Sequence, residues 1–159
     1  SQYVILGHSE NRILGENNSL INKKIKSSLE ENLKVIFCVG ETLNEKRNKK
    51  TIVILKKQIR EGLKGIKNIK NIIIAYEPVW SIGSGKILKS QELKKQILSI
   101  KKILKKLSKN NKVKILYGGS VSKRNIKMFS EINEINGFLI GGASQKAKNF
   151  IDIIKKSIN

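Results

Sequence analysis

Five short runs of apolar and β-branched residues, separated by longer polar stretches, constrain the fold of this chain more than any other feature. The runs are Tyr3–Leu6, Val35–Val39, Ile72–Tyr76, Val113–Tyr117 and Gly137–Ile140. Their first residues lie 24 to 41 positions apart, which leaves room for the helical crossover that parallel neighbouring strands require. The pattern therefore predicts an α/β fold of consecutive βα units around a parallel sheet.

The segments between these runs have the periodicity of helices. In Gln91–Leu107, apolar residues recur every three to four positions, and lysines occupy the other faces. Basic amphipathic helices also bind membranes or calmodulin, but we interpret this helix as one that covers a side of the sheet. Ser19–Asn32, Thr51–Leu63 and Phe150–Ile158 are further predicted helices. Because no Pro/Gly/Ser-rich linker divides the chain, we expect residues 1–159 to form a single domain.

The formal net charge of +21 suggests nucleic-acid binding at first sight. However, lysines make up 29 of the 33 basic residues and are scattered along the chain, whereas recognition of phosphates and bases favours the bidentate arginine fork. Isoleucine (27) and asparagine (16) are also abundant, and all three residue types have codons rich in A and T. We interpret the charge as coding bias and expect no nucleic-acid partner; a functional basic surface is the alternative.

Other features of the sequence bear on location. No apolar run of about 18 residues is present, so we expect no membrane span. A single cysteine, Cys38, rules out an internal disulfide framework and predicts a reducing compartment, by default the cytoplasm. The first residues have neither the pattern of a signal peptide nor an initiator methionine, and we expect the chain to be a piece of a longer protein.

Polar or glycine-rich residues directly follow every predicted strand. They are Gly7-His8-Ser9-Glu10, Gly40-Glu41-Thr42, Glu77-Pro78, Gly118-Gly119-Ser120 and Gly141-Gly142-Ala143-Ser144. Because parallel α/β folds bind their ligands at the carboxyl ends of the strands, this arrangement predicts the position of a site.

His8 and Glu77 are the candidates for acid–base chemistry at this site. His8 is the only histidine, and Cys38 lies within a predicted strand, so we expect no metal site. A lone histidine or glutamate is more often structural. Together at one end of parallel strands, however, they predict a proton shuttle with an electrophile or second acid.

The loop after the third strand has the composition of a mobile lid, with apolar residues at its start and glycines that can act as hinges. Its residues are Pro78, Val79, Trp80, Ser81, Ile82, Gly83, Ser84, Gly85 and Lys86. A Walker phosphate loop is excluded, because Trp80 stands where that motif needs glycine and Ile87 where it needs serine or threonine. The pairs Gly118-Gly119 and Gly141-Gly142 are better candidates for phosphate binding, each with a helix expected directly after it; the alternative is a tight turn.

Five segments, GHSENR, CVGETLNEKR, AYEPVWSIGSGK, ILYGGSV and GFLIGGAS, resemble the triosephosphate isomerase family in sequence and in order. The resemblance implies the last five β/α units of a (β/α)8 TIM barrel, and interconversion of dihydroxyacetone phosphate and glyceraldehyde 3-phosphate in glycolysis and gluconeogenesis. It implies that Glu77 transfers the proton, that neutral His8 polarises the carbonyl and that Glu10 supports the site. It implies phosphate contacts at Gly83, Ser120, Gly141 and Gly142, a homodimer, and no cofactor or metal.

Departures from the family pattern qualify this expectation. The chain begins at what resembles the fourth strand, so the family's Asn-x-Lys segment and dimer-forming third loop are absent. Without that lysine and with two open sheet edges, we expect the isolated chain to have negligible activity. Asn11 replaces an arginine and Asn136 an aspartate, while Ser81 and Ser84 are milder changes in the lid. The alternative function is that of a degenerate half-barrel that binds a partner through its basic surface.

Overall fold

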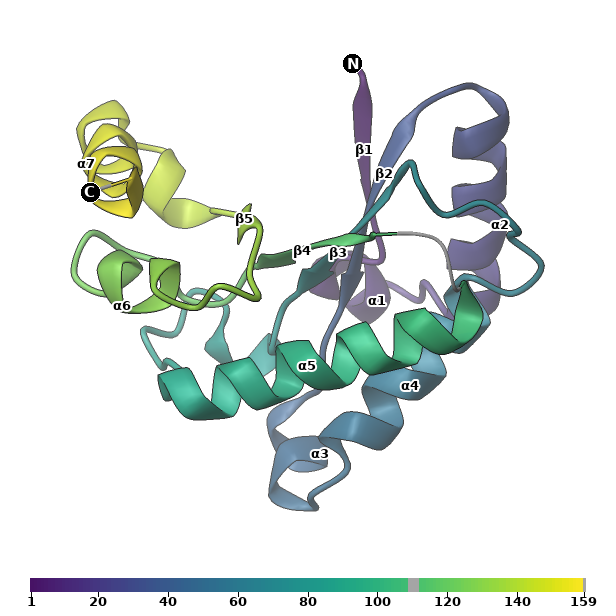
Figure 1. The fold of residues 1–159 in the computed structure, drawn as a ribbon, viewed down its shortest axis with the longest axis horizontal. Coiled ribbons are helices and arrows are strands. Elements are labelled where there is room, and N and C mark those ends of the chain that lie inside the picture. Colours follow the sequence, from purple (N-terminus) through teal and green to yellow (C-terminus); the bar gives the residue numbers. More distant parts are fainter. Residues whose placement is uncertain (109–111, 159) are drawn as a thin grey trace.

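The predicted strands form and pair in sequence order into one parallel sheet. The computed structural model describes residues 1–108 and 112–158. Its strands are β1 (Tyr3–Leu6), β2 (Lys34–Val39), β3 (Ile72–Tyr76), β4 (Lys114–Tyr117) and β5 (Gly137–Phe138). The order is β1-β2-β3-β4-β5, so among the described residues β1 and β5 each leave one edge unpaired, as predicted. This is the α/β fold expected, a partial TIM barrel (Figure 1).

Helices and short 3₁₀ turns connect the strands. They are α1 (Ser9–Ile13), α2 (Asn18–Glu30), α3 (Leu43–Arg47), α4 (Thr51–Gly62), η1 (Val79–Ser81), α5 (Ser90–Leu107), α6 (Ile126–Ser130), η2 (Gly142–Ser144) and α7 (Ala147–Ile158). The sequence analysis missed α1, α3 and α6, because five residues are too few to show helical periodicity.

Several predicted element bounds are wrong by one to three residues. The Asn17 side chain accepts the N–H of Leu20 and so starts α2 one residue before the predicted Ser19. The helix α7 begins at Ala147 rather than Phe150. The strand β5 pairs with β4 over two residues and ends at Phe138, before the predicted Ile140.

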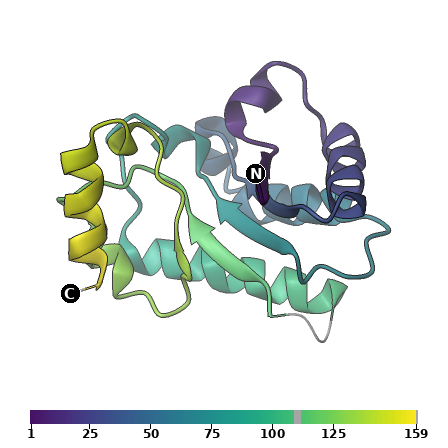
Figure 2. The same ribbon diagram turned by 90° about the horizontal axis from the view of Figure 1, so that it is seen from above.

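One face of the sheet carries the hydrophobic core. The register places Val35 beside Ile72 and Phe37 beside Ile74, and these four side chains are at most 1% exposed. The helices α2, α4 and α5 lie against this face (Figures 1 and 2). Their buried side chains include Ile21, Ile25, Leu55, Ile59, Leu93, Ile97 and Ile100. The basic helix α5 therefore covers the sheet, and its apolar stripe is part of the protein's core.

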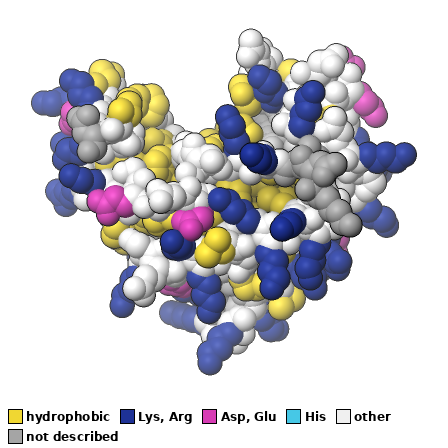
Figure 3. Space-filling view, viewed as in Figure 1, with side chains coloured by type: hydrophobic (Ala, Val, Ile, Leu, Met, Phe, Trp, Pro, Cys, Tyr) yellow, Lys and Arg dark blue, Asp and Glu magenta, His cyan; other side chains and the backbone are white. Residues whose placement is uncertain are grey.

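The edge strand β1 and the helix α7 expose apolar side chains. On β1, Tyr3 is 42% and Ile5 46% exposed, and on α7 Phe150 is 37% exposed. A cavity of about 610 Å³ lies between β5 and α7, lined by residues that include Phe138 and Ile154. Figure 3 shows a hollow between the part that carries β5 and α7 and the part that carries β1 and α2. Among the described residues, no helix is long and apolar enough to cross a membrane.

Candidate active site

The loops that follow the strands lie at one end of the sheet, because all the strands run in the same direction. Hydrogen bonds continue the pairing beyond the strands themselves. The N–H of Glu77 donates to the carbonyl of Val39 at 2.8 Å, and the N–H of Gly118 donates to the carbonyl of Tyr76 at 2.9 Å. The residues directly after β3 and β4 are therefore held by the rigid sheet rather than by mobile loops.

His8 and Glu77, which the sequence analysis selected, face each other across this end of the sheet. His8 Nε2 lies 3.6 Å from Glu77 Oε1. The Glu77 side chain is 5% exposed and that of His8 is 27% exposed, so a ligand approaching from solvent meets the imidazole first. The two groups are close enough to act on neighbouring atoms of one small molecule.

Two glycines permit the position of Glu77. A Cβ on Gly40 would lie 1.8 Å from the Glu77 carbonyl oxygen, which is an impossible contact with backbone. A Cβ on Gly118 would lie 2.7 Å from Glu77 Cγ and 3.0 Å from Oε1. The glycines that follow β2 and β4 therefore leave the space that the carboxylate and its backbone occupy.

Burial makes Glu77 a stronger base than an exposed glutamate. Desolvation raises the pKa of Glu77, although the neighbouring Cys38 thiol and the charges of His8 and Arg12 act in the opposite direction. Glu77 Oε2 is buried and has no hydrogen-bond partner among the described residues. Burial, with the charge of Glu77, also raises the pKa of Cys38, so this cysteine remains a thiol beside the carboxylate.

The start of α1 orients the imidazole of His8. His8 is the N-cap residue, and its Nδ1 accepts the N–H of Glu10 at 3.4 Å. In the neutral ring this acceptor role leaves the proton on Nε2, the nitrogen that faces Glu77. The capping interaction thus presents an N–H donor to the site.

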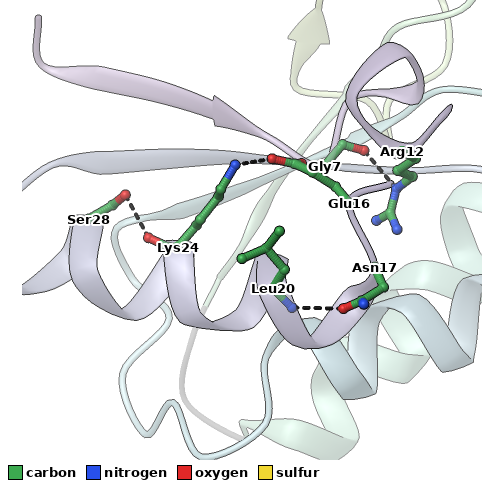
Figure 4. A network of polar contacts seen from close by, with 7 residues as sticks. All are labelled: Gly7, Arg12, Glu16, Asn17, Leu20, Lys24 and Ser28. Atoms are coloured by element: carbon green, nitrogen blue, oxygen red, sulfur yellow. Dashed lines mark hydrogen bonds and ion pairs between the residues drawn. The ribbon is translucent and has the colours of Figure 1, made fainter. Parts of the chain in front are cut away.

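Arg12 joins the ends of β1 and β2 beneath the site. Its Nε donates to the carbonyl of Gly7 at 2.7 Å, and its Nη2 to the carbonyl of Cys38 at 3.2 Å. Its Nη1 donates to Asn18 Oδ1 at 2.7 Å. Figure 4 shows Arg12 near the start of α2, where Glu16 forms an ion pair with Lys24. Arg12 is thus a positioning residue for the loop that carries His8.

The lid is attached to the loop that follows β2. Trp80 Nε1 donates to Glu41 Oε1 at 2.9 Å, and Lys46 Nζ lies 3.7 Å from the centroid of the indole ring. Glu41 also accepts the hydroxyl of Tyr76 at 3.2 Å. Burial raises the pKa of Glu41, and its hydrogen bonds from Trp80 and Tyr76 partly offset that effect. Lys46 in turn forms an ion pair with Glu92 at 3.0 Å, which ties this contact to α5.

The predicted phosphate-binding residues lie close to the lid. Ser120 lines a cavity of about 540 Å³ together with Gly85 of the lid and Ala143 of the loop after β5. A Cβ on Gly83, Gly141 or Gly142 would meet no atom within 4 Å, so space is open at all three residues. The prediction of a helix directly after Ser120 is wrong, because α6 begins only at Ile126. After Gly141 the short turn η2 precedes α7.

Glu10 is placed beside His8 rather than beside Glu77. Its carboxylate lies 3.8 Å from His8 Nδ1, and its side chain is 83% exposed. Asn11 is exposed on the same short helix. The side-chain Oδ1 of Asn136 accepts the N–H of Ile115 at 2.9 Å, and the backbone N–H of Asn136 donates to the carbonyl of Ile115 at 2.8 Å. The oxygen of a neutral side-chain amide is therefore the acceptor at this position.

Sequence reasoning did not assign roles to Glu41, Lys46 or Arg12. Glu41 was visible as a polar residue directly after a strand, but no pattern linked it to Trp80, which is 39 residues away. Lys46 and Arg12 are two of 33 basic residues, and nothing in their spacing distinguishes them.

The parallel sheet of consecutive βα units, with His8 and Glu77 close together at the carboxyl ends of its strands, is that of part of a (β/α)8 barrel. The sequence pattern of the family described as triosephosphate isomerase matches residues 1–157. The chain belongs to the triosephosphate isomerase family, as the resemblance predicted.

Curated relatives agree with this assignment. The triosephosphate isomerase of Thermodesulfovibrio yellowstonii is 47% identical over 157 residues, with 97% of this chain and 64% of the relative covered. That of Dictyoglomus thermophilum is 46% identical over 159 residues, with 96% and 64% covered. That of Borrelia garinii subsp. bavariensis is 47% identical over 160 residues, with 96% and 63% covered. The chain therefore spans 63% to 64% of the length of these relatives.

Proposed function

We propose that this chain carries the proton-transfer and phosphate-binding residues of a triosephosphate isomerase, which interconverts dihydroxyacetone phosphate and D-glyceraldehyde 3-phosphate. The observation that carries the proposal is the 3.6 Å separation of His8 Nε2 and Glu77 Oε1 at the carboxyl ends of the strands. The names of the relatives support the same reaction.

In the proposed reaction, the Glu77 carboxylate removes a proton from the carbon beside the carbonyl. The electron pair of that C–H bond forms the C=C bond of an enediolate, and negative charge moves to the carbonyl oxygen. The Nε2–H of His8 donates its proton to this oxygen, and Nε2 takes up the proton of the neighbouring hydroxyl in return. The electron pair left on that hydroxyl oxygen forms the new carbonyl, while the C=C electron pair takes the proton that Glu77 returns to the former carbonyl carbon. The buried position of Glu77 supports the role of base, because desolvation raises its pKa.

The substrate phosphate would bind beyond Glu77, at the loops after β4 and β5 and the tip of the lid. Gly118 touches Glu77, and Ser120 lies two residues further along the same loop. We assign phosphate contacts to the backbone N–H groups of Gly83, Ser120, Gly141 and Gly142. Open space at the three glycines supports this assignment, because a phosphate needs close access to the backbone.

Full activity needs a cation that the described residues do not bring to the pair. Among the described residues, no lysine or arginine lies within ion-pair distance of the Glu77 or Glu10 carboxylate, whose nearest titratable nitrogens belong to the neutral His8. The guanidinium of Arg12 is bound to two carbonyls and Asn18. We therefore propose that residues 1–159 form a partial barrel domain with negligible activity of its own. The exposed apolar edges of β1 and α7 would be covered when the barrel is completed.

The further assignments rest on family membership. We propose a cytoplasmic homodimer for the complete enzyme, without cofactor, metal or nucleic acid. The alternative, a half-barrel that binds partners through a basic surface, is not favoured, because Lys and Arg side chains are spread over the face in Figure 3 rather than gathered in one patch.

The test is isomerisation of dihydroxyacetone phosphate in deuterium oxide by the complete protein, followed by NMR. We expect turnover with solvent deuterium in the product. We expect Glu77→Gln to lower kcat by about 100-fold or more, and Glu77→Asp to lower it sharply because the carboxylate retracts by one methylene. Glu30→Gln, at an exposed position on α2, is the matched control. Wild-type turnover by Glu77→Gln refutes the proposed base, and equal turnover by the 159-residue chain refutes the need for a further cation.

A further inference from the structure

Ser81 occupies an unusual position for a lid residue, because its side chain is fully buried (0% exposed). Its hydroxyl donates to the carbonyl of Lys86 at 2.5 Å, at the far end of the lid. The same oxygen accepts the backbone N–H of Ser120 at 3.1 Å. A hydroxyl has one donor and two acceptor sites, so both bonds exist together.

Through Ser81 Oγ, these two bonds connect the start of the lid, the end of the lid and the segment after β4. The bond to Lys86 closes the lid tip, residues 82–85, into a loop. The bond from Ser120 ties that loop to the segment after β4. Gly119 permits this approach, because a Cβ there would lie 2.9 Å from Ser81 Oγ.

The proposed function assigns a second acceptor, the substrate phosphate, to the N–H of Ser120. An N–H group has one hydrogen and forms one strong hydrogen bond at a time. We propose that Ser81 Oγ competes with the substrate phosphate for the Ser120 N–H, so that phosphate binding and release of the lid from this loop are one event. This inference rests on the proposed function.

The competition favours the phosphate once it arrives. A phosphate oxygen is charged and accepts a stronger hydrogen bond than a neutral hydroxyl does. Ser81 is then free to move with the lid, and its hydroxyl keeps the Lys86 carbonyl as a partner. In the absence of phosphate, Ser81 accepts the half-buried N–H of Ser120 and holds the lid in one position.

Ser84 supplies a matched comparison within the same lid. Its hydroxyl donates to the Trp80 carbonyl at 2.9 Å and accepts the Lys86 N–H at 3.2 Å. It therefore makes a similar pair of bonds inside the lid, but among the described residues it makes no bond to Ser120.

The experiment uses the complete protein labelled with ¹⁵N, with inorganic phosphate and glycerol 3-phosphate as probes. We expect Ser81→Ala to increase solvent exchange of the Ser120 amide and to tighten binding of both probes about twofold to tenfold, the factor that one lost hydrogen bond implies. Ser81→Cys, whose thiol is a weaker acceptor, should lie between wild type and Ser81→Ala. Ser84→Ala should leave exchange of the Ser120 amide at the wild-type rate.

Three results separate the inference from the function on which it rests. If wild type binds both probes and Ser81→Ala binds them equally or more weakly while its circular dichroism matches wild type, the competition is refuted. If Ser84→Ala accelerates exchange of the Ser120 amide as much as Ser81→Ala does, the effect belongs to the lid as a whole and the inference also fails. If wild type binds neither probe and the Ser120 amide resonance does not shift, the proposed phosphate site itself is refuted.

Discussion

Replacing Glu77 by glutamine is expected to stabilise the fold at neutral pH while it removes the proposed base. The Glu77 side chain is 5% exposed, and its Oε2 has no hydrogen-bond partner among the described residues. When Glu77 is ionised, the folded protein therefore holds a poorly solvated carboxylate. Glutamine has nearly the same shape without the charge, so the variant avoids this cost.

The sign of the pH dependence follows from the direction of the pKa shift. Burial raises the pKa of Glu77 above its unfolded value. A carboxyl group with a raised folded pKa contributes stability that is present below the unfolded pKa and is lost as the pH rises through the folded pKa. The advantage of Glu77→Gln should therefore be absent near pH 4 and largest near pH 8.

The expected gain in stability of Glu77→Gln follows from the Oε2 atom of Glu77, which has no hydrogen-bond partner among the described residues. An unsatisfied buried polar group costs about 1–3 kcal/mol, and the glutamine amide keeps part of that cost. We therefore expect Glu77→Gln to increase the free energy of unfolding by about 1 kcal/mol at pH 8. For a protein of this size, that increase raises Tm by about 2–4 °C.

Thermal unfolding of wild type and Glu77→Gln at pH values from 4 to 8 measures this difference. Glu30→Gln removes one charge from an exposed site and controls for the change in net charge. A difference in Tm that does not vary with pH, or a wild type more stable than Glu77→Gln at pH 8, would contradict the assignment of Glu77 as a desolvated base.

Two further predictions concern Gly118 and the contact between Trp80 and Glu41. Gly118→Ala should lower kcat by about 100-fold, because the added Cβ would lie 2.7 Å from Glu77 Cγ and displace the carboxylate. Steady-state kinetics of the variant test this prediction, and a wild-type kcat would show that the glycine is dispensable. Trp80 is the only tryptophan, so its fluorescence should titrate with Glu41 at a pH above the ordinary range for glutamate, because burial raises the pKa of Glu41. Glu41→Gln should abolish that transition, and its persistence in the variant would assign it to another group.

Much of the fold was predictable because it depends on local sequence patterns. The β-branched runs gave the strands, and their spacing gave parallel pairing in order. The apolar stripe of α5 gave its buried face, including Leu93 and Ile97. Element ends were less predictable, since they depend on single contacts. The early start of α2 depends on the bond from Leu20 N–H to Asn17.

The sequence by itself also determined the end of the sheet at which the site lies and the residues at its centre. His8 and Glu77 follow strands of one direction, and parallel strands bring their carboxyl ends together. Only the tertiary structure decided how these residues are held. The Arg12 bond to Cys38, the Glu41 bond to Trp80 and the Ser81 bond to Ser120 join residues from different βα units. Such contacts depend on distances set by strand pairing and packing, which no periodicity along the chain encodes.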